Sequence, residues 1–181
     1  VAARWSAGMN PVLRDARPED LPAITAIYAH HVRTGAASFE TEPPDETEMR
    51  ERYEAIRSKG LPWLVAELGG RVAGYAYAGL YRARFAYRFT LEDSIYVDPA
   101  CVRAGVGRAL LERLIAECES AGARQLVAVI GGSDNEASIR LHAGLGFRPV
   151  GILRAAGWKH GRWVDSVLMQ REIGMGSASP P

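Results

Sequence analysis

The sequence is short of cysteine, of long apolar stretches and of any excess of charge. Only 2 of its 181 residues are cysteine, too few for the disulfide framework that holds many small secreted domains together. We therefore expect Cys101 and Cys118 to be unpaired thiols and the protein to be cytoplasmic. No apolar stretch approaches the roughly 18 residues that a transmembrane helix needs. Residues 1–10 also lack the apolar run of a secretory signal peptide.

Neither sign of charge dominates. The 22 Lys and Arg residues nearly balance the 21 Asp and Glu residues, which leaves a formal net charge of +1. This balance gives no reason to expect a nucleic acid, a membrane surface or another polyanion as a partner. The hydrophobic fraction of 48% and the charged fraction of 24% are typical of an ordinary globular protein.

The length of the chain, without a long linker or an internal repeat, predicts one folded domain. We expect this domain to span residues 12–173. Residues 1–11 are expected to be disordered or in part an expression remnant. Residues 174–181, GMGSASPP, are expected to form a flexible tail.

Apolar periodicity alternates between the strand and helix patterns along the chain. Strands are expected over residues 12–15, over two segments that Gly69-Gly70 joins as a hairpin, and over residues 91–97, 125–130, 147–156 and 162–171. Helices are expected over residues 18–34, from the N-cap Asp45, after Gly105 and over residues 136–145. This order predicts a mixed sheet with helices packed against it, an α/β or α+β fold with one core.

Two glycines, Gly105 and Gly107, stand where the long third helix should begin. Glycine costs about 1 kcal/mol relative to alanine inside a helix, so the backbone there is expected to lie close to a ligand. The free N–H groups of a helix start form an anion site, most naturally for phosphate, and Arg103 and Arg108 add charge. A glycine-containing loop without a ligand is the alternative. A P-loop is disfavoured because no Gly-Lys-Ser/Thr follows, and a dinucleotide fold because the third glycine is absent.

The order of strand, glycine loop, helix, strand and helix, followed by SDNEASIRLHAGLGF, resembles the GNAT family of acetyl-CoA-dependent N-acetyltransferases. The segments PWLVAELGGRVAGYAYAG, VAVIGG, GLGFRPVGILRAAGWKHGRWVD and SFETEP are similar to those of its phosphinothricin and methionine sulfoximine acetyltransferases. The resemblance covers residues 12–173. It implies a GNAT-type mixed, mostly antiparallel central sheet of about seven strands flanked by about four helices. It also implies acetyl-CoA as co-substrate, a small-molecule amine substrate, no metal and a homodimer.

The resemblance assigns the third helix start to the pyrophosphate of coenzyme A. The family pattern Gln/Arg-x-x-Gly-x-Gly/Ala falls on residues 102–107, where Val102 departs from it, so Arg103 is expected to supply charge instead. Asn135 resembles the asparagine that bonds the pantetheine arm, although a plain helix cap is a competing interpretation. The residues expected to bind the cofactor are Ile95, Tyr96, Val97, Arg103, Ala104, Gly105, Val106, Gly107, Arg108, Asn135 and Ser138.

Acetyl transfer from a thioester to an amine needs a base for the ammonium, a donor for the oxyanion and an acid for the thiolate. The resemblance places the base at Glu92 and the oxyanion donor on the backbone of residues 95–97. It places His142 where many members carry a tyrosine that protonates the thiolate. Asp93 would point to the opposite face of its strand from Glu92. A solvated carboxylate and a packed helix histidine are the plainer alternatives, and His30 and His31 are expected to be structural.

The arginine-rich segment before Glu92 is expected to select the substrate. Two guanidinium groups, Arg82 and Arg84, with Tyr87 beside them, suit a small amine that also carries a carboxylate or a phosphinate. Phe39 would pack on its aliphatic part. A solvated loop is the alternative, and Trp158-Lys159-His160 receives no role.

The sequence therefore predicts an N-acetyltransferase for an amino-acid-like substrate, acting by direct attack. A peptide or protein N-acetyltransferase and a non-catalytic acyl-CoA-binding regulator are the rival hypotheses.

Overall fold

Seven strands run through the described chain, and all belong to one sheet. The computed structural model describes residues 10–181, so the expectations for residues 1–9 lie outside it. The strands are β1 (Val12–Asp15), β2 (Trp63–Leu68), β3 (Arg71–Leu80), β4 (Thr90–Val97), β5 (Gln125–Gly131), β6 (Arg148–Lys159) and β7 (Arg162–Glu172), in the spatial order β1-β2-β3-β4-β5-β7-β6. The helices are α1 (Leu21–Thr34), α2 (Glu46–Arg57), α3 (Val106–Ser120) and α4 (Glu136–Ala143). This mixed sheet with its four helices confirms the expected fold class.

Several boundaries differ from the expected ones. Residues 18–20 form a 3₁₀ turn, so α1 begins only at Leu21. The fourth helix ends at Ala143, because Gly144 takes the C-cap position. The last two strands are longer than expected. β6 is exposed along almost its whole length, so the alternation of apolar and polar residues that marks a half-buried strand is absent there.

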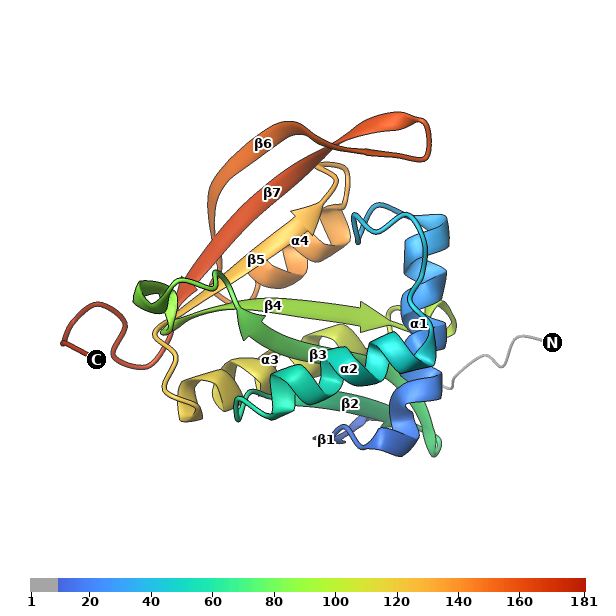
Figure 1. Cartoon of the computed structure of the whole chain (residues 1–181), viewed down its shortest axis with the longest axis horizontal. Helices are drawn as coiled ribbons and strands as arrows, with labels where there is room; N and C mark the ends of the chain where they lie inside the picture. Colours follow the sequence, from blue (N-terminus) through green and yellow to red (C-terminus); the bar gives the residue numbers. More distant parts are fainter. Residues whose placement is uncertain (1–9) are drawn as a thin grey trace.

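The four helices cover the two faces of the sheet in pairs, as Figure 1 shows for α1 and α2 on one side and α3 and α4 on the other. Trp63 and Tyr75 face α1 and α2 and are 1% exposed each. The expected apolar stripe of α3 is confirmed, since Val106, Leu110, Leu111, Leu114, Ile115 and Cys118 are all buried. Within residues 10–181 no helix is long and apolar enough to cross a membrane.

Gly74 in β3 lets α3 lie close to the sheet. A Cβ atom at this position would be 2.9 Å from the Tyr96 carbonyl oxygen and 3.0 Å from Cγ1 of Val106. The first contact is shorter than real Cβ atoms make, and the second is tighter than most. Cys101 and Cys118 are buried and unbonded, in line with the expectation of unpaired thiols.

One strand pair determines the position of the site. Every neighbouring pair is antiparallel except β4 with β5, which run parallel and are joined by the crossover through α3. Their register begins at Thr90 with Gln125 and ends at Asp93 with Ala128, although both strands continue. The carboxyl halves of β4 and β5 therefore separate.

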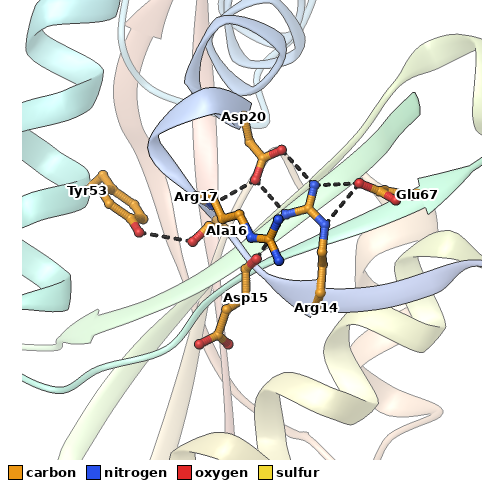
Figure 2. A network of polar contacts seen from close by, with 7 residues as sticks. All are labelled: Arg14, Asp15, Ala16, Arg17, Asp20, Tyr53 and Glu67. Carbon is orange, nitrogen blue, oxygen red and sulfur yellow. Dashed lines mark hydrogen bonds and ion pairs between the residues drawn. The ribbon is translucent and has the colours of Figure 1, made fainter. Parts of the chain in front are cut away.

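A polar network ties the start of the chain to the edge of the sheet (Figure 2). Asp20 accepts hydrogen bonds from both terminal nitrogens of Arg14, at 2.7 Å each, and from the Arg17 N–H at 2.7 Å. Arg14 also donates to Glu67 of β2 from its Nε atom, at 2.9 Å. Burial raises the pKa of Asp20, but the hydrogen bonds from Arg14 and Arg17 outweigh it and leave the pKa below its ordinary value.

We expect Asp20→Asn to lower the free energy of unfolding by about 1–3 kcal/mol at pH 7, because hydrogen bonds to a charged group are lost. The contribution of Asp20 is fully present above the pKa of an unfolded aspartate, about 3.9. It is lost as the pH falls through the lower folded-state pKa, so the difference from wild type should shrink in acid.

Asp15→Asn is the matched control. Its carboxylate is 58% exposed and meets Arg57 at 3.2 Å, so urea unfolding should show a change below about 0.5 kcal/mol. Equal losses of unfolding free energy in the two variants would contradict the stabilising role of the Asp20 hydrogen bonds.

Candidate active site

The separation of β4 from β5 leaves main-chain groups of β4 without a strand partner. The main-chain N–H and C=O groups of the even-numbered β4 residues point toward β3. The bonds from Tyr81 N–H to the Thr90 carbonyl and from Asp98 N–H to the Ala73 carbonyl show this. Main-chain groups alternate in direction along a strand, so the N–H and C=O groups of Ile95 and Val97 face the gap.

A cavity of about 300 Å³ occupies this gap, bordered by α1, β4, β5 and α4. Six of the expected site residues line it together: Ile95, Tyr96, Val97, Asn135, Ser138 and His142. Ser94 and Tyr96 point to the α1–α2 face of the sheet, while Asp93, Ile95 and Val97 point to the α3–α4 face. The cavity therefore has walls from both faces.

His31 of α1 holds the end of β4. Its Nε2 atom lies 2.8 Å from the Val97 carbonyl oxygen, and a carbonyl can only accept, so Nε2 carries the hydrogen. Burial lowers the pKa of His31, which favours the neutral ring. Of the gap-facing groups at Ile95 and Val97, this carbonyl is thus occupied, whereas the two N–H groups are directed toward the cavity.

The Asn135 side chain caps α4. It accepts a hydrogen bond from the Ser138 N–H at 3.3 Å, and its own amide lies 3.5 Å from the Gly131 carbonyl. The geometry thus contains the helix cap, and a bond from Asn135 to a ligand stays a prediction.

His142 is buried and paired with Asp93. The Nε2 atom lies 2.9 Å from Asp93 Oδ2, and Nδ1 lies 2.8 Å from the Ser138 carbonyl oxygen. Burial lowers the pKa of His142, but the hydrogen bond and charge of Asp93 outweigh it and raise the pKa above its ordinary value. Asp93 therefore favours the protonated form of the ring.

Glu92 lies next to this pair but on the α1–α2 face of the sheet. It lies just outside the cavity, because the part of β4 that lines the cavity begins at Asp93. Burial, and then repulsion from Asp93, raises the pKa of Glu92, and the charge of Arg82 opposes the rise. A raised pKa brings a carboxylate closer to the working range of a general base at neutral pH.

The start of α3 lies beside the cavity. Gly105 is its N-cap with φ of 76°, a left-handed conformation that favours glycine. The first main-chain bond of the helix runs from Ala109 N–H to the Gly105 carbonyl. The N–H groups of residues 106–108 therefore point past the helix end.

The two arginines expected to add charge at this turn differ in their surroundings. Arg103 is exposed with φ of 67°. Arg108 instead pairs with Glu112, Nε to Oε1, at 2.9 Å. Gly107 could carry a Cβ atom with ordinary contacts of 3.5 and 3.6 Å, so the chain itself does not require glycine there. Val102, which departs from the family pattern, lines the cavity.

The expected substrate residues do not line the cavity and belong to two separate segments. Arg82, Arg84 and Tyr87 are exposed on the segment that leads into β4, whose first residue pairs with the start of β5. Phe39, 40% exposed, packs against Gly157 of β6. Its segment, residues 35–45, lies on the far end of β5.

This segment, the α1–α2 loop, is fixed by close contacts. The buried Lys159 ammonium donates to the Ser38 carbonyl at 2.6 Å. A Cβ atom on Gly131 would lie 1.8 Å from the Ala36 carbonyl oxygen, so only glycine fits there. Ala37 of the same loop lines the cavity.

Two residues that line the cavity have no functional role predicted from the sequence. An alternating strand does not reveal that Asp93 has a partner 49 residues away. The contact of His31 with the Val97 carbonyl is structural, as expected, and its helical spacing with the buried Ile24, Ile27 and Tyr28 is a signal that places it against the sheet.

A helix start with free N–H groups beside a strand edge with free N–H groups is suited to a transferase that binds an extended, phosphate-bearing donor. Comparison with known proteins agrees with this class. The model of the acetyltransferase (GNAT) family matches residues 24–147, and the chain belongs to this family.

The relatives give a finer comparison. The chain is 57% identical to phosphinothricin N-acetyltransferase of Alcaligenes faecalis, over 93% of this chain and 86% of the relative. It is 42% identical to the L-methionine sulfoximine/L-methionine sulfone acetyltransferase of Salmonella typhimurium strain LT2, over 89% and 94%. A crystal structure of a GNAT superfamily phosphinothricin acetyltransferase from Sinorhizobium meliloti in complex with AcCoA superposes with a TM-score of 0.93 at 47% identity, over 96% of this chain and 94% of that chain.

We expect Gly131→Ala to lower the melting temperature, because its Cβ atom would displace the Ala36 backbone. Overpacking of this kind costs about 1–3 kcal/mol or more. Gly35→Ala is the matched control in the same loop, since its Cβ atom would come no closer than 3.8 Å to a neighbour. Thermal unfolding of both variants measures the difference. A wild-type melting temperature for Gly131→Ala would refute the close approach of Gly131 to the Ala36 backbone.

Proposed function

We propose that the protein is an N-acetyltransferase that moves the acetyl group of acetyl-CoA to the amine of a small amino-acid-like substrate by direct attack. The observation that carries the proposal is the cavity between β4 and β5. The buried pair of Asp93 and His142 lines this cavity, and the Glu92 carboxylate lies next to it on the other face of the sheet. The similarity to phosphinothricin and methionine sulfoximine acetyltransferases supports the substrate class.

The co-substrate is proposed to lie along the free edge of β4. The N–H groups of Ile95 and Val97 suit the amides of an extended arm and the developing oxyanion of the thioester. The N–H groups at the start of α3, from Gly105 onward, suit a pyrophosphate. Arg103, with no side-chain partner among the described residues, supplies positive charge, whereas Glu112 partly neutralises Arg108.

Asn135 and Ser138 border the same arm from α4. The remaining residues proposed to contact acetyl-CoA are Tyr96, Ala104, Val106 and Gly107.

Glu92 is proposed as the general base. Its raised pKa favours taking a proton from the substrate ammonium, directly or through water. The freed amine then attacks the thioester carbon from the α1–α2 side of the gap. Glu92 and the incoming amine thus share one face of the sheet, and the leaving thiolate is close to the other.

His142 is proposed as the acid for that thiolate. It lies in the cavity wall on the α3–α4 side, and the charge of Asp93 helps it to remain protonated. A thiol with a pKa near 8.5 leaves reasonably well as an anion, so this assistance should be weaker than that of Glu92.

Arg82, Arg84 and Tyr87 are proposed to attract the acidic group of the substrate at one end of the gap. A guanidinium pairs well with a carboxylate or a phosphinate. Phe39 is proposed to contact the aliphatic part from the other end. This arrangement favours a small anionic amine over a peptide amine.

A cytoplasmic homodimer is the proposed working form. Two buried, unpaired cysteines suit a reducing compartment. Trp158 and Trp163 pack edge to face on the β6–β7 hairpin and remain 58% and 62% exposed, which suits contact with a second subunit.

The function is tested by following thiol release from acetyl-CoA with a panel of amino-acid analogues, including phosphinothricin and methionine sulfoximine. We expect Glu92→Gln to lower kcat by about 10²- to 10⁴-fold at pH 7, because the base is lost and the shape is kept. Raising the pH should restore part of the rate, since the free amine then forms in solution. Glu119→Gln, at an exposed position of α3, is the control, and wild-type turnover of Glu92→Gln would eliminate Glu92 as the base.

Arg84→Ala tests substrate selection without altering the pKa of Glu92, on which Arg82 acts. Loss of a charge-assisted contact of roughly 1.5–3 kcal/mol should raise KM for an acidic analogue about 10- to 150-fold. KM for acetyl-CoA should stay nearly constant. Arg113→Ala on α3 is the matched control, and an equal rise in both KM values would indicate a structural role for Arg84.

A further inference from the structure

Both ring nitrogens of His142 face acceptors of the protein. Nδ1 lies 2.8 Å from the Ser138 carbonyl oxygen and Nε2 lies 2.9 Å from Asp93 Oδ2. A carbonyl oxygen only accepts hydrogen bonds, so Nδ1 carries a hydrogen. The contact of Nε2 with a carboxyl group then requires a second hydrogen between the two atoms. A free imidazole is a stronger base than a free carboxylate, which favours placing this hydrogen on the ring, and a ring that donates from both nitrogens is an imidazolium.

The pair is enclosed by protein. The side chains of His142 and Asp93 are 2% and 1% exposed, and the Phe147 ring packs edge-on against the imidazole with centroids 5.0 Å apart. The second carboxyl oxygen, Asp93 Oδ1, is buried with no hydrogen-bond partner among residues 10–181. An uncompensated buried charge is costly, so the carboxylate depends on the imidazolium for compensation.

The other ionisable groups near the pair come from β4 and α3. Glu92 is the neighbour of Asp93 in the chain but points to the opposite face of the sheet. Cys118 of α3 faces Asp93, and burial together with the Asp93 charge raises its pKa to about 12, so this thiol stays neutral. Ser138 and Phe147 carry no charge. Asp93 is therefore the charged group that acts directly on His142.

We propose that Asp93 is a positioning residue that keeps His142 protonated at neutral pH, so that the two side chains work as one acid for the departing thiolate. This inference rests on the proposed acetyl transfer. Asp93 itself need not touch the substrate, because it acts through the ring that it holds.

The proton balance of the step is simple. When the carbon–sulfur bond of the tetrahedral adduct breaks, sulfur keeps the electron pair and takes one proton from the hydroxyl of Ser138, which lines the cavity. Ser138 Oγ lies 3.4 Å from His142 Nδ1 and is replenished with a proton from the imidazolium. A neutral imidazole then remains beside the Asp93 carboxylate. The substrate nitrogen loses two protons on its way from ammonium to amide, and both leave to solvent through Glu92 on the other face. The pair takes one proton back from solvent before the next turnover, so each turnover releases one proton.

Nuclear magnetic resonance of the wild-type protein with ¹⁵N-labelled histidine tests the protonation without any change at the site. The chain has four histidines, and His142→Gln assigns the signal by its loss. We expect both His142 nitrogens to carry hydrogen at pH 7, above the value of about 6.5 at which a free imidazole is half protonated. A neutral ring at pH 7 would overturn the proposal.

The kinetic test uses Asp93→Asn, which keeps the shape but removes the charge. Because the carboxylate favours the imidazolium, its loss should make His142 lose its proton at a lower pH. The pH at which kcat falls on the alkaline side of its profile should therefore also be lower than in wild type. At pH 8, kcat should drop by about tenfold or more, with both KM values within about threefold of wild type.

A thioester with a much more acidic thiol separates acid catalysis from folding. Its thiolate needs no proton, so the deficit of Asp93→Asn should shrink. A deficit of equal size with both thioesters, at an unchanged alkaline limb, would show that Asp93 only supports packing and would refute the proposal. Asp15→Asn, an exposed aspartate on β1, is the matched control.

The outcomes also separate this inference from the proposed function. If no amine analogue is acetylated but His142 is protonated at pH 7, the proposed function is wrong and the proposed protonation of His142 is supported. If acetylation proceeds and His142 is neutral, the proposed function is supported and the role of Asp93 is wrong. Should Asp93→Asn fold poorly, the wild-type titration still decides.

Discussion

The site depends on the point at which β4 and β5 stop pairing. Four residue pairs hold the two parallel strands together, and after Asp93 and Ala128 the strands part. Main-chain groups that a continuous sheet would satisfy internally are thereby turned toward a cavity. Leaving such groups buried without partners is costly, and His31 relieves part of this cost at the Val97 carbonyl. The remaining donors at Ile95 and Val97 give the gap a preference for a ligand with acceptor groups spaced like those of a strand.

The same divergence gives two neighbouring carboxylates opposite environments. Glu92 and Asp93 are adjacent in the chain, so strand geometry sends them to different faces. On one face Glu92 is half-buried, and burial raises its pKa toward the range of a base. On the other face Asp93 is fully enclosed with His142. The proposed proton uptake by Glu92 and the proposed proton release by His142 thus lie on opposite sides of one strand.

Much of this arrangement could be predicted from the sequence, because helices with a strong apolar stripe and strands with turn signals are local features. The stripe of α3 and the hairpin at Gly69-Gly70 are examples, and short motifs predict six of the residues that line the cavity. The partnership of Asp93 with His142 joins residues 49 positions apart, and no local pattern encodes it. The full length of β6 is not predictable from its own residues for a related reason. Its exposed side chains lack the alternation of a half-buried strand, and hydrogen bonds to β7 hold it in place.

The contact between Gly131 and the Ala36 carbonyl has a consequence for how such an enzyme can change over evolutionary time. Because the loop backbone is pinned to the end of β5, point mutations within the loop can exchange side chains, such as that of Phe39, without releasing the main chain. The proposed substrate contact of Phe39 could therefore be exchanged by a single mutation, while the cavity wall formed by Ala37 stays in place. A mutation at Gly131 offers no such gradual route, since every alternative residue would move the whole loop at once.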